Sequence, residues 1–566
     1  MRTYRIILMA IIACFINITT PANAETVTNC DFESLKSIIL RLNQTDGGEV
    51  DFACAGKIRF TETLTISGDV TLNGTEDVIL DGYGLYTLFK IENNASLTLD
   101  TVTIQEAWQA IENRGILTIT NSLFHDNQAY IMGSVIHNFG DVSISDSTFT
   151  GNETSEGGVI YNRAGNMTIT NSTFSMNRAY TKGGAIFNDA DMTITGCIFN
   201  QNSVEGAYTT GGAIWNEGNM TIADSQFAQN SAYSAGAIYN TQQLTIANSQ
   251  FTHHTGGAIY TSHKLFVRDS TFADNDGGYG GAISSSGEVV IWDTDFLRNT
   301  GSVGGAIEND QAMTIRGSLF EANIAERGGG AIFNYWKSGD DSVEVSISHS
   351  TFKDNVAGLY GGAIYYDNTD TIAIFNNTFV NNSAKVGGAF YNGAEGVANI
   401  IYNTFVNNLG LGGALYNNNQ ASIQYNLISG DGSQCSGLQV GLVDETNLTD
   451  SRCGGAGRVD SLMLGEFDGR VFPLLDESPA INIAPLPCDV SRDQLGIPRP
   501  LGEMCDAGAT EWMRADEVII TTPQNITITD CTAQVFQEAI TILNWVGGEI
   551  TLDCPADTSI TITKAF

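Results

Sequence analysis

The fold is decided by a repeated stretch, one copy of which reads Phe174-Ser-Met-Asn-Arg-Ala-Tyr-Thr-Lys-Gly-Gly-Ala-Ile-Phe-Asn188. Its second half, Gly-Gly-Ala-Ile-aromatic-Asn, recurs twelve times with variations, and each copy follows a Phe-x-x-Asn segment, with His254 replacing the Asn once. Self-similarity at a period of about 20 to 50 residues is typical of solenoids and propellers. The Ala or Val of the phrase lies at positions 135, 159, 185, 213, 237, 258, 282, 306, 331, 363, 389 and 414.

Each repeat contains short alternating runs such as Met167-Thr-Ile-Thr170, separated by clusters of Gly, Asn, Asp and Ser. Such runs predict short strands, and no repeat holds a stretch long enough for a helix. A propeller blade needs about 40 to 45 residues, whereas ~25 are enough for one three-strand coil of a parallel β-helix. The sequence therefore predicts an all-β fold, a right-handed parallel β-helix over residues 58–430.

The position within the repeat predicts which side chains face inward. The residue after Ala is Ile in most copies, otherwise Phe390 or Leu415, so it should form a buried column. We expect the repeated Asn side chains to form ladders of hydrogen bonds, and the Gly pair to allow a positive φ. The residue after Ile should point outward, and it is aromatic at Tyr161, Phe187, Trp215, Tyr239 and Tyr260.

This aromatic stripe, formed by those five residues, has two interpretations. Amphipathic rings are favoured at recognition surfaces, so the stripe could bind a glycan or a host protein. Equally, the rings could stack on one another and simply stabilise the sheet.

The flanking segments predict the domain organisation. Arg2 and Arg5, an apolar run and Ala22-Asn-Ala24 indicate a secretory signal over residues 1–24, so the mature chain should be exported. Residues 25–57 should form an N-terminal cap with an amphipathic helix. Residues 431–515 should form a C-terminal closing module, and residues 516–566 should begin a second, truncated β-helix unit. No later stretch is long and apolar enough to predict a membrane span.

Eight cysteines fall into local pairs, which predicts disulfides in an oxidising compartment. Metal ligation is the alternative, but it would require tighter clusters and partner histidines. The pairs are Cys30 with Cys54, Cys435 with Cys453, Cys488 with Cys505, and Cys531 with Cys554.

The chain is strongly acidic, with 63 Asp and Glu against 26 Lys and Arg in 566 residues. This charge excludes nucleic acid as an expected partner, since phosphate binding requires clustered cations. We expect a glycan or a cell-surface protein as the partner of a monomeric rod. No cofactor is expected, although Ca²⁺ could be held by surface carboxylates.

Three consecutive coils carry Arg268, Trp292 and Arg316 at an outward position that elsewhere is usually Thr or Ala. We expect these side chains to form one patch with nearby carboxylates. In a saccharide site, Trp292 would stack on a sugar, Arg268 or Arg316 would bind or deprotonate a uronic acid, and carboxylates would act as acid and base or hold calcium. Alternatively, cation–π contacts and charge pairs stabilise the sheet without any substrate. The nearby carboxylates are Asp269, Asp293, Asp295, Glu308 and Asp310.

The paired repeat from Phe124 to Leu415 resembles that of the chlamydial polymorphic outer-membrane proteins. The segment from Phe472 to Ala509 is similar to the "choice-of-anchor" modules of bacterial surface β-helix proteins. These resemblances imply a passenger at the cell surface, in the outer membrane or outside the cell, and a role in adhesion. Our leading hypothesis is a non-catalytic, adhesin-like protein. The alternative is a carbohydrate-active β-helix: a pectate-lyase-like polysaccharide lyase, a glycoside hydrolase or a polysaccharide-binding protein.

Overall fold

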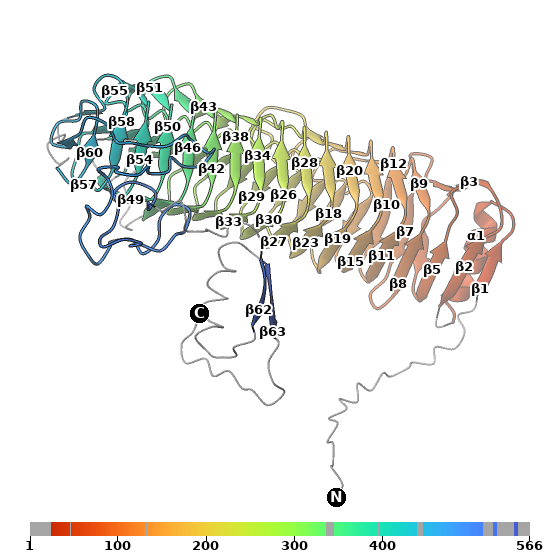
Figure 1. Ribbon diagram of the computed structural model, residues 1–566. Coiled ribbons are helices and arrows are strands. Elements are labelled where there is room, and N and C mark those ends of the chain that lie inside the picture. The colour runs from red at the N-terminus through yellow and green to blue at the C-terminus, as the bar shows by residue number, and fades with distance from the viewer. Residues whose placement is uncertain are drawn as a thin grey trace, which may run out of the picture. The chain divides into compact units, whose positions relative to one another are not determined.

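The computed structural model confirms an all-β parallel β-helix of about 16 turns (Figure 1). One turn contains β19 (Met167–Thr170), β20 (Thr173–Ser175), β21 (Arg178–Ala179) and β22 (Ile186–Asn188), and each strand pairs in parallel with its counterpart in the next turn. The structure describes residues 24–45, 47–130, 133–335, 344–368, 370–393, 396–437, 445–512, 524–528 and 548–552.

The chain divides into two compact units. The first comprises Met1–Phe266 and Ala273–Gly278, and the second comprises Val267–Phe272 and Tyr279–Phe566. Within the described residues, no helix has the length and apolar character that crossing a membrane requires.

The first unit begins with the predicted helical cap, which is a single short helix. Helix α1 (Phe32–Leu42) starts after Asp31, whose carboxylate accepts a hydrogen bond from the Ser34 backbone N at 2.8 Å. Its apolar side is buried, and the disulfide between Cys30 and Cys54 joins its N-terminal end to the chain beyond β2 (Gly48–Phe52). The cap therefore closes the exposed strand edges of the first turn.

The repeated Phe and Ile positions form the core of both units, as predicted. In the first unit, Phe124 and Phe149 are fully buried, and their ring centroids stack at 4.7 Å. In the second unit, Phe296 and Phe320 stack at 4.8 Å. The side chains that follow Ala, such as Ile186 and Ile214, are likewise fully buried. Each turn therefore buries the same hydrophobic positions against its neighbours.

Asparagine ladders run through the turns, which confirms the prediction that the repeated Asn side chains bond to one another. The Nδ2 of Asn152 donates to the Oδ1 of Asn177 at 3.0 Å, and the Nδ2 of Asn177 donates to Asn202 in the same way. A second ladder includes Asn138 and Asn162, whose amides lie 2.7 Å apart. These amides are fully buried, so the ladder supplies the partners that buried polar groups need.

The C-terminal part of the second unit folds back along the side of the β-helix. Gln494 accepts a hydrogen bond from the Thr378 hydroxyl at 2.6 Å and donates one to the Thr351 hydroxyl at 2.9 Å. The backbone N of Ala509 donates to the Thr404 hydroxyl at 3.0 Å. Residues 461–512, which we call the C-terminal strap, therefore cover the outer face of β46 (Thr351–Lys353), β50 (Thr378–Val380) and β54 (Thr404–Val406).

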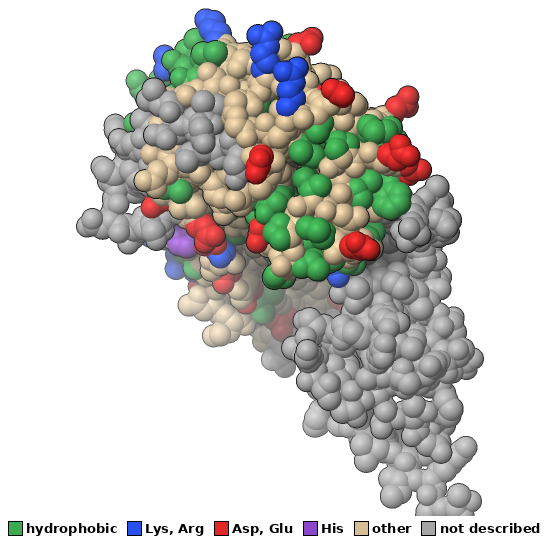
Figure 2. Space-filling model, turned by 60° about the vertical axis from the view of Figure 1, so that its left-hand side comes forward, with side chains coloured by type: hydrophobic (Ala, Val, Ile, Leu, Met, Phe, Trp, Pro, Cys, Tyr) green, Lys and Arg blue, Asp and Glu red, His purple; other side chains and the backbone are tan. Residues whose placement is uncertain are grey.

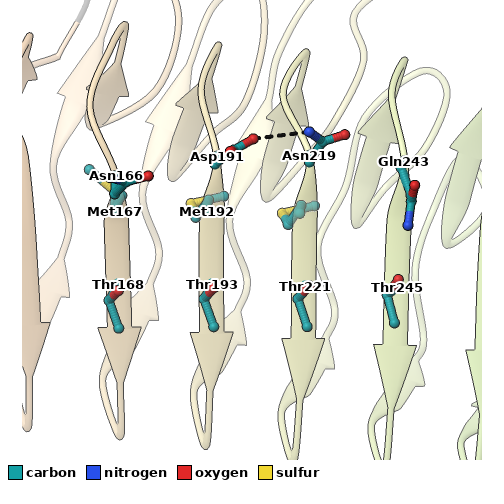
Figure 3. Close-up of a pocket in the computed structure, with 11 residues that line it drawn as sticks. Asn166, Met167, Thr168, Asp191, Met192, Thr193, Asn219, Thr221, Gln243 and Thr245 are labelled. Carbon is teal, nitrogen blue, oxygen red and sulfur yellow. Dashed lines mark hydrogen bonds between the residues drawn. The ribbon is translucent and has the colours of Figure 1, made fainter.

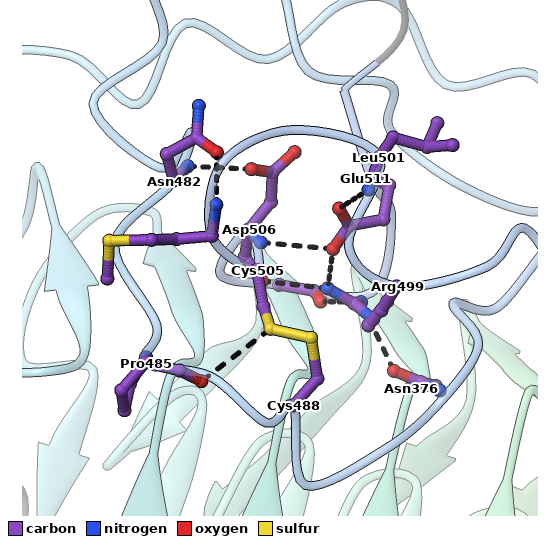
Figure 4. Close-up of a disulfide and its surroundings, with 11 residues drawn as sticks. Asn376, Asn482, Pro485, Cys488, Arg499, Leu501, Cys505, Asp506 and Glu511 are labelled. Atoms are coloured by element: carbon purple, nitrogen blue, oxygen red, sulfur yellow. Dashed lines mark hydrogen bonds and ion pairs between the residues drawn. A yellow bond between two sulfur atoms is a disulfide. The ribbon is translucent and has the colours of Figure 1, made fainter.

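Three of the predicted disulfides are present. Cys30–Cys54 lies at the cap, Cys435–Cys453 joins the last turns, and Cys488–Cys505 lies within the strap (Figure 4). The predicted Cys531–Cys554 pair lies outside the described residues. Most of the second β-helix predicted for residues 516–566 also lies outside the described residues. Within it, β62 (Gln524–Ile528) and β63 (Gly548–Leu552) pair in parallel.

Candidate functional site

The structure brings Arg268, Trp292 and Arg316 together on one sheet. They are the last residues of β33 (Leu265–Arg268), β37 (Val289–Trp292) and β41 (Met313–Arg316). Trp292 and Arg316 are register partners, and the backbone N of Asp269 donates to the Trp292 carbonyl at 3.2 Å. All three side chains are exposed, Trp292 to 43%. The exposed ring of Trp292 thus lies on a strand between two strands that each end in an arginine, Arg268 or Arg316.

Asp269 and Asp293 lie at the corner that follows these strands. Their φ angles are 49° and 46°, in the left-handed region, where Asp and Asn are the most common residues after Gly. The Arg268 Nη1 donates to the Asp269 carboxylate at 2.6 Å. The pKa of Asp293 is raised above its ordinary value, mainly by burial and also by the charge of Asp269. Arg316 and Arg470 of the strap oppose this shift only in part. The corner geometry alone accounts for aspartates at these positions.

Glu308 lies on a different sheet, which corrects the expectation of a single patch. It is the middle residue of β40 (Ile307–Asn309), which pairs with β36 (Ile283–Ser285), whereas the arginines lie on the sheet of β33 and β41. Its carboxylate accepts a hydrogen bond from the Ser284 hydroxyl at 2.8 Å. Burial raises the pKa of Glu308, Ser284 lowers it, and Asp310 raises it further. Glu308 therefore interacts with its own sheet and loop rather than with the arginines.

The aromatic stripe is largely covered, which corrects the expectation of an exposed surface. Tyr161, Phe187 and Trp215 are only 4%, 6% and 8% exposed, while Tyr239 and Tyr260 are half-buried. The ring centroids of Trp215 and Tyr239 stack at 4.1 Å, and those of Tyr239 and Tyr260 at 4.8 Å.

Polar side chains complete the contacts of the stripe. The Nζ of Lys182 lies 3.8 Å from the centroid of the Trp215 ring, and the Trp215 Nε1 donates to Glu217 at 2.9 Å. The Tyr161 hydroxyl donates to Asp189 at 2.9 Å. These contacts favour the stacking interpretation, in which the rings stabilise the sheet. A binding role of these residues stays a prediction.

A polar groove crosses four strands of the first unit (Figure 3). It has a volume of about 270 Å³ and lies over β19, β23 (Met192–Thr195), β27 (Met220–Ala223) and β30 (Leu244–Ala247). One row of outward hydroxyls lies across it, beside a row of amides and one carboxylate. The Asn219 Nδ2 donates to Asp191 at 3.0 Å. The hydroxyl row consists of Thr168, Thr193, Thr221 and Thr245.

A second hollow, of about 410 Å³, was not identified from the sequence. It lies beside β13 (Gln128–Ala129), β17 (Glu153–Thr154) and β21, and exposed Tyr130 and Tyr180 line it. A sequence signal does exist, because Asn-x-Ala-Tyr recurs at 127–130, 177–180 and 230–233.

Hydrophobic side chains also gather on part of the surface, with acidic side chains around them (Figure 2). In the second unit, Ile324 and Val356 are register partners and are 48% and 40% exposed. Leu409 and Leu411 on β55 (Leu409–Leu411) are 56% and 53% exposed.

Among the described residues, no three His, Cys, Asp or Glu side chains form a group that could hold a metal ion. Calcium binding therefore stays a prediction.

Comparison with known proteins identifies the fold. The family model described as "Right handed beta helix region" matches residues 87–251, 157–334 and 214–397, which together span more than half of the chain. No curated protein matches the sequence significantly.

Solved structures with a similar fold include the following two. A mutant tailspike protein of E. coli bacteriophage HK620, in complex with a pentasaccharide, is 9% identical, with a TM-score of 0.34 over 74% of this chain and 76% of that one. The alginate lyase AlyF-OU02 is 12% identical, with a TM-score of 0.27 over 60% of this chain and 85% of that one. At these scores the similarity carries no argument about function.

Proposed function

This chain belongs to the right-handed β-helix family, and from that premise we propose that it is an exported, non-catalytic, adhesin-like protein. Its β-helix surface would bind a glycan or a cell-surface protein outside the cell. The proposal rests on the outward side chains of the turns rather than on one specialised centre, because a stack of similar turns repeats the same surface many times.

The separation of the candidate catalytic groups carries this proposal. Acid–base catalysis on a glycan requires two groups within reach of one bond. Arg268 and Arg316 lie on one sheet, and Arg268 is paired with Asp269 at 2.6 Å, whereas Glu308 lies on another sheet with Ser284. Arg268 and Glu308 thus each have a partner close to their own strand, Asp269 and Ser284 respectively.

Export is supported by the disulfides and by the N-terminal sequence. Three disulfides occur in the described residues, and such bonds persist in oxidising compartments. The signal-like residues 1–24 and the resemblance of the repeat to polymorphic outer-membrane proteins support display at the bacterial surface.

The polar groove offers hydroxyl and amide groups, which can bind the hydroxyls of a glycan.

An adhesion assay tests the proposal. Beads coated with the intact chain should bind to cell monolayers or glycan-coated surfaces. The matched control is a bead coated with the reduced, unfolded chain, which has the same formal charge of −37. Equal binding by the unfolded chain would mean attraction by charge or composition alone. Failure of the intact chain to bind any of these surfaces would also reject the adhesin role.

A carbohydrate-active enzyme remains the second candidate, because one observation favours it. Trp292 is a large ring, 43% exposed, with Arg268 and Arg316 on the neighbouring strands. If this face were catalytic, Arg268→Ala and Arg316→Ala should abolish turnover of a polysaccharide while the β-rich circular dichroism stays intact.

A further inference from the structure

We infer that the hollow between Tyr130 and Tyr180 is a saccharide-binding site for neutral pyranose residues. This inference rests on the proposed function in so far as that function is glycan binding, and it names the site and the class of glycan. The site lies entirely within the first unit, on the loop side of the short strands β13, β17 and β21.

The hollow arises from one small residue between two large ones. Gln128 pairs with Glu153, and Glu153 pairs with Arg178, so β13, β17 and β21 are in register in successive turns. The residue two positions after each of these is Tyr130, Ser155 and Tyr180, respectively. The two tyrosines are therefore two turns apart, or ~10 Å along the stack. Ser155 lines the space between them.

The two rings are presented to solvent, and each has one neighbouring side chain packed against it. Tyr130 is 73% exposed and Tyr180 is 43% exposed. The Trp108 ring lies 4.8 Å from the Tyr130 ring, and the Arg178 guanidinium lies 4.7 Å from the Tyr180 ring. An aromatic ring with a fixed orientation and an exposed face suits the C–H face of a sugar, which it can contact at low entropic cost. In this respect the hollow differs from the aromatic stripe, in which Tyr161, Phe187 and Trp215 are buried.

Polar groups at the hollow can bind sugar hydroxyls. The Glu153 carboxylate accepts a hydrogen bond from the Tyr180 hydroxyl at 2.6 Å, so the carboxylate and the ring are fixed relative to each other. Gln128, directly opposite Glu153 in the register, supplies an amide with both donors and an acceptor. A carboxylate and an amide beside aromatic rings are a suitable combination for vicinal hydroxyl groups.

The charge of the site selects neutral sugars. Arg178, the cation beside the hollow, forms an ion pair with Glu205 and lies 3.9 Å from Glu153. Glu153 itself lines the hollow, and the chain as a whole carries a formal charge of −37. A uronic acid would therefore meet net repulsion, while a neutral hexose would not.

Binding measurements on the full chain test this inference. Isothermal titration should compare neutral hexose oligosaccharides (gluco-, manno- and galacto-configured) with uronate oligosaccharides. We expect a neutral ligand to bind, and Tyr130→Ala and Tyr180→Ala each to weaken its affinity roughly three- to tenfold. Ser155→Trp fills the hollow without removing a ring, so it should abolish binding. Tyr279→Ala is the matched control, since Tyr279 is 69% exposed but lies outside the hollow.

Each other outcome overturns the inference. It fails if no oligosaccharide binds, if only uronates bind, or if all variants bind as the native chain does. Unchanged circular dichroism of the variants excludes misfolding as the cause of lost binding. The bead assay separates this inference from the proposed function: beads that adhere equally well with Ser155→Trp reject the hollow but keep the adhesin role. Binding of a neutral oligosaccharide without bead adhesion keeps the hollow and rejects that role.

Discussion

At the scale of single residues, the buried asparagines show most clearly how the repeat is stabilised. Asn177 receives two hydrogen bonds from Asn152 and donates its own amide to Asn202 and to the Phe149 carbonyl. Every one of these groups is out of reach of water, so loss of one amide leaves donors and acceptors of the neighbouring turns without partners.

We predict that Asn177→Ala lowers the free energy of unfolding by roughly 2 to 4 kcal/mol, since it leaves several buried polar groups unpaired. Asn166→Ala is the matched control, because Asn166 is exposed, and its effect should stay within about 0.5 kcal/mol. Urea unfolding followed by circular dichroism measures both. Equal effects of the two substitutions would show that the ladder adds no stability.

A buried carboxyl group in the strap predicts a pH dependence. Burial raises the pKa of Asp493 from 3.8 to about 6, although backbone N–H groups and Arg499 oppose the shift. Because the folded pKa is above the unfolded value, the folded state binds the proton more tightly. The contribution of Asp493 is therefore fully present below about pH 4 and is lost as the pH rises through about 6, by at most about 3 kcal/mol.

Hydrogen exchange of the strap, measured between pH 4 and pH 7 and corrected for intrinsic rates, tests this contribution. Protection in the strap should fall as the pH rises, and Asp493→Asn should flatten that dependence. A strap whose protection rises with pH in the native chain and is unchanged by Asp493→Asn would contradict the assignment.

At the scale of elements, the period of the repeat predicted the strands and their inward positions, but not how the four strands of one turn are divided among different sheets. Phe174 and Ile186 were placed correctly, because their burial follows from alternation within a strand. Glu308 was placed wrongly beside Arg316, because proximity in the sequence does not specify which sheet a residue faces. The contact of Lys182 with the Trp215 ring could not be predicted from the sequence either, since it depends on the path of a loop.

The stripe makes its own prediction at this scale. Trp215→Ala should destabilise the protein by about 3 to 5 kcal/mol, because it removes a buried ring from a stack. Tyr208→Ala, at a side chain that is 83% exposed, should change the stability by less than about 0.5 kcal/mol. Thermal unfolding of the two variants compares them directly. A stripe that serves only recognition would give Trp215→Ala native stability and weaker adhesion.

The strap is held together by its own disulfide, Cys488–Cys505, and by a buried ion pair between Arg499 and Glu511, both of which lie within it (Figure 4). Arg499 bonds to Glu511 at 2.5 Å and to Asn376 at 3.2 Å, which joins the strap to the underlying turn. The disulfide closes a loop between Cys488 and Cys505, which are 17 residues apart. Removing it should destabilise the strap by about 3 kcal/mol.

Limited proteolysis of the double variant Cys488→Ser and Cys505→Ser tests this role. Cleavage within residues 461–512 should become faster, while the turns of the first unit stay protected. Uniformly faster cleavage of both units would show that the disulfide stabilises the whole chain rather than the strap.

At the scale of the whole molecule, the sequence and the structure agree on a chain built to repeat one surface. The three disulfides are compatible with our proposal that the protein works outside the cell. The separation of Glu308 from Arg268 and Arg316 bears most directly on its chemistry. The sequence could propose these residues, but only the sheet order decides which of them share a face.

The most direct test of the account is to incubate the intact chain with neutral and acidic polysaccharides and to follow two signals. New reducing ends would report hydrolysis, and ultraviolet absorbance of unsaturated products would report elimination. We predict that the chain binds a polysaccharide without producing either signal. Turnover of any polysaccharide that is lost in Arg268→Ala or Arg316→Ala would contradict it and would make the face around Trp292 an active site.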